Sequence, residues 1–177
     1  MSEFEYGMFG EYSPSPTRFG VQRYHDISCG HRVFGHESKC IGLHGHNYRI
    51  TFFCEPEDQL DAVGRVIDFS IVKSKLCDWV EENWDHRFLL WENDPLLYFF
   101  KDAPLHMQGY KNTEIDDMMK GLEAITPVPF NPTAENMAGY LLNTVAPKQL
   151  YGTGVTATSI RIDETRKCSA TAMQSRN

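Results

Sequence analysis

The chain has 177 residues, a formal net charge of −7 and a hydrophobic fraction of 41%. This length fits a single domain, residues 1–177, that can bury a core without disulfide bonds. An acidic chain without a basic stripe is not expected to bind nucleic acid. The sequence has no apolar run as long as a membrane span and no secretory signal. We therefore expect a cytoplasmic protein without membrane contact, in which the five cysteines stay reduced.

The first part of the chain predicts an irregular arm followed by two strands. Residues 1–16 are rich in Gly, Ser, Pro and aromatic residues, which is typical of an irregular segment. In the stretches 19–31 and 47–54, apolar and polar residues then alternate, and alternation with a period of two predicts half-buried strands.

The second part of the chain predicts two helices and a closing strand. Apolar residues with helical spacing predict a helix over 68–84 and another over 132–145, the latter with Asn131 as its N-cap. Periodicity is weak between them, and we interpret 89–130 as an irregular insert. A closing strand is predicted over 155–165. This order predicts an α+β fold with helices on one face of an antiparallel sheet.

Three histidines are placed to share a metal ion. His44 and His46 are two residues apart, so on a strand both imidazoles project to the same side. His31 belongs to the neighbouring predicted strand and is the third candidate. A single histidine in such a position is more often an ordinary core or surface residue. The set of three, however, predicts a Zn²⁺ site with a fourth position open for water or substrate.

Four other residues are candidates for catalysis or binding. Cys40 lies four residues before His44, and a nearby dication would favour its thiolate form, which is a credible base. The alternative is that Cys40 is a small buried residue without a catalytic role. Asp85 could orient His86 as a proton carrier, provided that a turn lets these neighbours meet. In the closing strand, the alternation of residues places the Glu164 side chain on the face that is turned toward the core. A carboxylate there either pairs with a cation of the scaffold or is directed at a ligand.

These residues occur in an ordered series of motifs, C-x-x-x-H-G-H-N, V-I-D-F, D-H, N-P-T-A-E-N and E-T. The series resembles the 6-pyruvoyltetrahydropterin synthase and 6-carboxytetrahydropterin synthase family from about residue 27 to residue 170. The resemblance implies the tunnelling fold, a four-stranded antiparallel sheet with two helices on one face. It also implies a homo-oligomer, a trimeric barrel or a hexamer of two such barrels, with active sites between subunits.

The resemblance also implies a role for each residue that matches a family motif. The family's zinc ligands fall on the three histidines, its catalytic cysteine on Cys40, its relay pair on Asp85 and His86, and its pterin-anchoring glutamate on Glu164. Thr133 and Glu135 match the N-P-T-x-E motif, which implies helix capping and a place in the wall of the substrate pocket. Two features depart from the family: ISCGH in the first motif, and an insert that is longer than in compact members.

Two features resemble the 6-carboxy branch of the family: the short gap from Cys40 to His44, and V-I-D-F at 66–69. That branch implies the conversion of 7,8-dihydroneopterin triphosphate to 6-carboxy-5,6,7,8-tetrahydropterin, with release of acetaldehyde and triphosphate, on the route to queuosine. The alternatives are the pyruvoyl reaction, which eliminates triphosphate and keeps the carbon skeleton, and a non-catalytic zinc-binding assembly protein. Four basic residues are candidates to offset the triphosphate charge, although solvation at the surface is the better explanation for each of them: Arg32, Lys39, Arg166 and Lys167.

Overall fold

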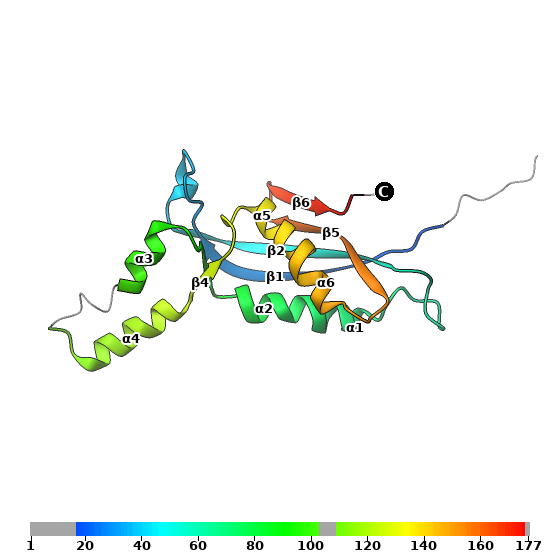
Figure 1. Cartoon of the computed structure of the whole chain (residues 1–177), viewed down its shortest axis with the longest axis horizontal. Helices are drawn as coiled ribbons and strands as arrows, with labels where there is room; N and C mark the ends of the chain where they lie inside the picture. The colour runs from blue at the N-terminus through cyan, green and yellow to red at the C-terminus, as the bar shows by residue number, and fades with distance from the viewer. Residues whose placement is uncertain (1–16, 103–108, 176–177) are drawn as a thin grey trace, which may run out of the picture.

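The computed structural model describes residues 17–102 and 109–175, so the predicted arm 1–16 lies outside the described residues (Figure 1). A single sheet has the strand order β4-β3-β1-β2-β5-β6. Four strands pair antiparallel in succession: β1 (Val21–His31), β2 (His44–Pro56), β5 (Val155–Asp163) and β6 (Ser169–Met173).

The predicted insert contains strands and helices of its own. β3 (Phe88–Trp91) pairs parallel with β1, and β4 (Ile125–Val128) pairs parallel with β3. The sheet therefore has six strands rather than the four predicted, and one of its edges is parallel. Strands of four residues are too short to show a period, and the apolar run in β3 fits a buried helix as well as a strand.

Two helical rods cover one face of the sheet, as predicted (Figure 1). Each rod contains a π-helical segment between two α-helices. The first rod consists of α1 (Phe69–Val72), η2 (Lys73–Cys77) and α2 (Asp78–Trp84). The second consists of α5 (Ala134–Tyr140), η4 (Leu141–Val145) and α6 (Ala146–Gln149). The core between sheet and rods includes Tyr48, Ile50 and Phe52 from β2, packed with Leu76 and Met137 from the rods. Burial of this apolar surface is the main term that stabilises the fold.

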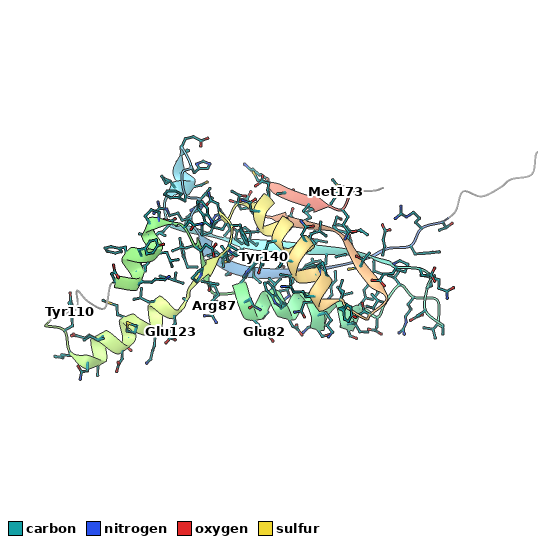
Figure 2. The ribbon with its side chains drawn as sticks, in the orientation of Figure 1. Glu82, Arg87, Tyr110, Glu123, Tyr140 and Met173 are labelled. Atoms are coloured by element: carbon teal, nitrogen blue, oxygen red, sulfur yellow. The ribbon has the colours of Figure 1, made fainter. Side chains whose placement is uncertain are left out.

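The insert projects beyond the end of the helical rods. Its helices are α3 (Pro95–Asp102) and α4 (Asn112–Glu123), which lie at the left of Figure 1. Tyr110 marks the outer end of this projection in Figure 2, and near the sheet the Arg87 side chain donates a hydrogen bond to the Glu123 carbonyl (3.2 Å). None of the helices in the described residues has the length and apolarity needed to span a bilayer.

The register of β1 and β2 brings the predicted metal ligands together. His31 lies opposite His44, and Cys29 lies opposite His46. Burial alternates along β1, where Ile27, Cys29 and His31 are buried and the residues between them are more exposed. The three histidines therefore share the face of the sheet that the helices cover.

Candidate metal centre and catalytic residues

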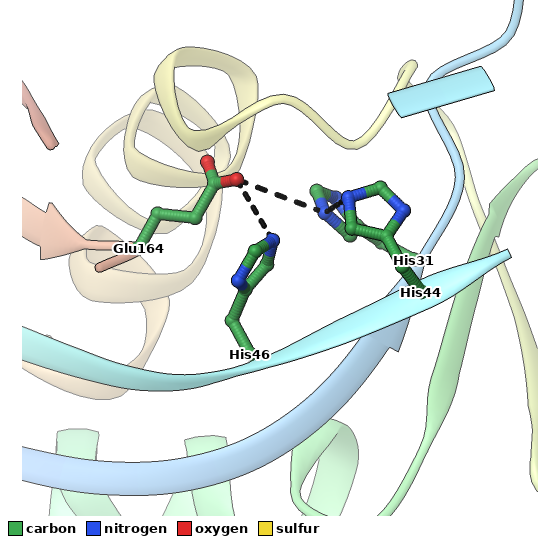
Figure 3. Close-up of side chains that lie close together, drawn as sticks. All are labelled: His31, His44, His46 and Glu164. Atoms are coloured by element: carbon green, nitrogen blue, oxygen red, sulfur yellow. Dashed lines mark hydrogen bonds and ion pairs between the residues drawn. The ribbon is translucent and has the colours of Figure 1, made fainter. Parts of the chain in front are cut away.

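The three histidines and Glu164 form one compact cluster (Figure 3). One ligand atom from each of the four residues can be chosen so that all lie within 4.8 Å of one another. The Nε2 atoms of His31 and His44 are 3.1 Å apart, and the Glu164 carboxylate lies 3.0 Å from His46 Nε2 and 3.9 Å from His31 Nε2. Side chains from the ends of three strands thus converge on one point.

Backbone carbonyls determine the tautomers of two of these histidines. His31 Nδ1 lies 2.7 Å from the Pro132 carbonyl oxygen, and His44 Nδ1 lies 2.8 Å from the Gly42 carbonyl oxygen. A carbonyl only accepts, so each Nδ1 carries a proton, and in the neutral form of each ring Nε2 then keeps its lone pair. Burial lowers the pKa of the His31 imidazole, although the Pro132 carbonyl opposes that shift, and the neutral ring is favoured.

The cluster has the donor atoms of a metal site. Two lone pairs facing each other across 3.1 Å are unfavourable, and a cation between them would relieve the repulsion. His46 Nε2 is buried and forms no hydrogen bond with any described residue, although the Glu164 carboxylate lies 3.0 Å from it. Three neutral imidazoles and a carboxylate are ligands that zinc accepts. The residues present therefore fit the predicted Zn²⁺, while the identity of the metal remains a proposal.

Glu164 was expected on the buried phase of the closing strand, but it lies just beyond it. β5 ends at Asp163, and Glu164 begins the turn into β6, where its backbone N–H donates to the Cys168 carbonyl (3.1 Å). Its side chain is half-buried and points at the histidines, with no scaffold arginine or lysine paired to it among the described residues. This position favours a carboxylate that is directed at a metal or ligand over one that is paired with a cation of the scaffold.

Asp85 and His86 make the predicted contact through a strained turn. Asp85 is the C-cap of α2 and His86 has a left-handed backbone (φ 53°), so the Asp85 carboxylate lies 2.6 Å from His86 Nδ1. A left-handed conformation costs a non-glycine residue on the order of 1 kcal/mol. Burial raises the pKa of the Asp85 carboxyl, but hydrogen bonds from the Ser28 N–H and from His86 outweigh burial and hold this pKa below its usual value.

The Asp85–His86 pair opens onto the other face of the sheet. The two residues line a surface hollow together with Ser28, Asn47 and Arg49, which alternate with the buried residues of β1 and β2. The side chain of His86 is 83% exposed. Within one chain, therefore, the sheet separates the Asp85–His86 pair from the histidine cluster.

The other three candidate residues, Cys40, Thr133 and Glu135, have different environments. Cys40 is half-buried in the short 3₁₀ helix η1 (Lys39–Ile41), between the strands that carry the histidines. The Thr133 side chain accepts a hydrogen bond from the Asn136 N–H and caps α5. Glu135 is exposed in the first turn of α5. The predicted capping role of Thr133 is thus confirmed, but the predicted N-cap at Asn131 is wrong.

Comparison with known proteins identifies the family. Residues 20–175 match the model of the family described as 6-pyruvoyl tetrahydropterin synthase. The chain belongs to this enzyme family. A relative from Rickettsia typhi, named 6-carboxy-5,6,7,8-tetrahydropterin synthase, is 34% identical over 145 residues, which cover 81% of this chain and 91% of the relative. A protein of the same name from Haemophilus influenzae is 25% identical over 150 residues.

Solved structures share the fold of the family. The chain superposes on an uncharacterized protein of Wolinella succinogenes with a TM-score of 0.74 at 23% identity, covering 90% of this chain and 100% of that one. The 6-pyruvoyl tetrahydropterin synthase of Caenorhabditis elegans gives a TM-score of 0.57 at 20% identity, with the same coverage. These comparisons confirm the predicted family and its tunnelling fold.

Sequence reasoning missed the groups that orient the family histidines. The carbonyls of Gly42 and Pro132 are backbone atoms, and no side-chain pattern reveals them. Asn131 was interpreted as a helix cap, yet its amide forms two hydrogen bonds with the backbone of Phe34. Only the place of Asn131 directly before Pro132, at the start of a motif, could have drawn attention to it.

Proposed function

We propose that this chain is a zinc-dependent 6-carboxy-5,6,7,8-tetrahydropterin synthase. Its substrate would be 7,8-dihydroneopterin triphosphate, and its products 6-carboxy-5,6,7,8-tetrahydropterin, acetaldehyde and triphosphate. The observation that carries the proposal is the convergence of three histidine Nε2 atoms and a carboxylate in a chain of this family. The relatives that bear the 6-carboxy name, at 31–34% identity over most of the chain, support this choice of reaction.

The proposed zinc ligands are His31, His44 and His46. Carbonyl partners on Nδ1 make the Nε2 atoms of His31 and His44 available, and His46 Nε2 forms no hydrogen bond with any described residue. Zinc bound there would supply Lewis acidity to a substrate oxygen. Glu164, beside this position, would accept hydrogen bonds from the N–H groups of the pterin and orient the ring.

Proton transfer is assigned to Cys40 and His86. The Cys40 thiol would act as a base, and the imidazole of His86, held by Asp85, would accept or donate a proton through Nε2 because Nδ1 faces the carboxylate. Glu135 and Thr133 would contribute to the wall of the substrate pocket at the start of α5, as the family motif implies.

Two copies of the chain would complete each site. The Asp85–His86 pair and the histidine cluster occupy opposite faces of one sheet, so a pair from a neighbouring copy is needed to reach the substrate at a given cluster. In a closed ring of identical subunits, each interface joins two different surface patches of neighbouring chains, so residues that are far apart in one chain can meet there. This geometry supports the expected trimeric barrel, alone or stacked as a hexamer.

The products of the reaction test the proposed function. The purified protein, loaded with zinc, is incubated with 7,8-dihydroneopterin triphosphate, and the products are analysed by mass spectrometry together with an acetaldehyde assay. We expect equimolar acetaldehyde and 6-carboxy-5,6,7,8-tetrahydropterin. Triphosphate release with an intact carbon side chain would assign the pyruvoyl reaction instead, and no turnover would leave only a zinc-binding protein.

A further inference from the structure

Asn131 joins three parts of the candidate site. Its side-chain oxygen accepts a hydrogen bond from the Phe34 N–H (2.9 Å), and its side-chain nitrogen donates one to the Phe34 carbonyl (2.7 Å). The Asn131 side-chain amide thus pairs both the N–H and the carbonyl of Phe34, as the backbone of a neighbouring strand would. Phe34 lies three residues after the end of β1, so the amide holds the chain where it leaves the sheet.

The segment held in this way connects His31 to His44 and carries Cys40. Besides the Asn131 amide, a backbone hydrogen bond from the Val33 N–H to the Cys40 carbonyl (2.9 Å) closes the segment. An ion pair between Arg32 and the buried Asp94 (3.2 Å) also ties the start of the segment to the insert. The stability of a local segment depends on its own contacts, so removal of the Asn131 amide should loosen the loop where it leaves β1.

The backbone around Asn131 is itself fixed by the start of α5. The Asn131 carbonyl accepts hydrogen bonds from the Thr133 N–H (2.8 Å) and from the Asn136 side chain (2.9 Å). The next carbonyl, that of Pro132, accepts from His31 Nδ1 (2.7 Å). One short segment therefore orients a metal ligand through its backbone and holds the Cys40 loop through a side chain.

We propose that Asn131 is a positioning residue of the metal site. Its amide holds the loop 32–43 to the start of α5, which keeps the Pro132 carbonyl against His31 and fixes Cys40 relative to the histidines. Groups that orient a metal ligand from behind typically change metal affinity or activity by roughly 10–100-fold when they are removed. The inference rests on the proposed metal site and adds a residue to which no role in that site was assigned.

The test compares Asn131→Ala and Asn131→Asp with an exposed asparagine, Asn83→Ala, as the matched control. Among the described residues, the Asn83 amide donates only to the Trp79 carbonyl of its own helix. Asn131→Asp preserves size and the acceptor for the Phe34 N–H but sets a carboxylate oxygen against the Phe34 carbonyl. Cobalt(II) is titrated into metal-free protein and followed by its visible absorption, and alkylation of Cys40 by iodoacetamide is followed by peptide mass spectrometry.

We expect both Asn131 variants to bind cobalt about tenfold more weakly or worse, with an altered absorption spectrum, and Cys40 to be alkylated faster. Asn83→Ala should match the wild-type protein in both measurements. Folded Asn131 variants with wild-type cobalt affinity and wild-type alkylation would overturn the proposal. Loss of the native circular dichroism spectrum in both variants would also overturn it, because the amide would then serve folding alone.

The two measurements keep this inference separate from the proposed function. If the wild-type protein binds no cobalt, the proposed metal site is wrong. The rate of Cys40 alkylation then still decides whether Asn131 holds the loop, since this measurement needs no metal.

Discussion

Backbone carbonyls and one carboxylate define the chemistry of the histidine cluster. The Pro132 and Gly42 carbonyls hold the protons of His31 and His44 on Nδ1, which leaves Nε2 of each ring able to bind a metal. Glu164 is the charged group beside these nitrogens, and its role as a fourth ligand or as a substrate anchor can be separated by one substitution.

Glu164→Gln should keep the metal and lose affinity for the substrate. Three histidines suffice to hold zinc in a catalytic site, whereas a hydrogen bond to a charged acceptor contributes about 1.5–3 kcal/mol, or roughly tenfold or more in affinity. Zinc content and the dissociation constant of a pterin inhibitor are measured on the same preparation. Zinc loss as severe as in a His46→Ala variant would instead make Glu164 a ligand.

Asp85 provides a prediction about pH. Because its folded-state pKa is depressed, its ionised form stabilises the fold at pH values above the ordinary value of about 3.9, and this contribution is lost as the pH falls through the folded-state pKa. The difference in thermal midpoint between the wild-type protein and Asp85→Asn should therefore shrink as the pH falls below about 3.9. The exposed control Asp117→Asn should show no such trend, and a difference that grows in acid would contradict this reasoning.

At the scale of the elements, α5 begins two residues later than the sequence predicts. Asn131 and Thr133 are both good cap formers, and propensity alone could not choose between them. The choice follows from tertiary structure, since the Asn131 amide is engaged with Phe34 and only Thr133 is free to accept from the Asn136 N–H.

Thr133→Ala should destabilise the protein by about 1 kcal/mol without loss of metal, because it removes a helix cap and no ligand. Chemical denaturation gives the change in the free energy of unfolding, and Thr133→Ser, which retains the capping oxygen, should recover most of it. Unchanged stability, or a loss that serine does not recover, would mean that the hydroxyl has another role.

Much of the site followed from sequence because strands impose a simple geometry. A period of two put His44 and His46 on one side, and the antiparallel partner strand added His31. The insert could not be predicted in the same way: β3 and β4 are short, and their parallel pairing with β1 depends on contacts between distant parts of the chain. The separation of His86 from the histidines likewise depends on the turn at Asp85, which no local pattern encodes.

At the scale of the whole molecule, the histidine cluster and the Asp85–His86 pair lie on opposite faces of the sheet. This placement predicts that two inactive variants restore activity when they assemble into one oligomer. Cys40→Ala and His86→Ala should each lose most turnover, since a proton-transfer group typically contributes roughly 10²–10⁴-fold. When the two variants are unfolded, mixed and refolded together, some interfaces combine an intact Cys40 with an intact His86, and activity should return. Each variant refolded alone is the control. A mixture that stays at background would show that each chain works by itself.

The dependence of turnover on zinc tests the central claim most directly. Zinc is titrated into metal-free protein while turnover of 7,8-dihydroneopterin triphosphate is followed in the same sample. We expect that activity rises in proportion to bound zinc, levels off at about one ion per chain, and stays at background in His46→Ala at every zinc concentration. Full activity in the metal-free protein, or in His46→Ala, would contradict it.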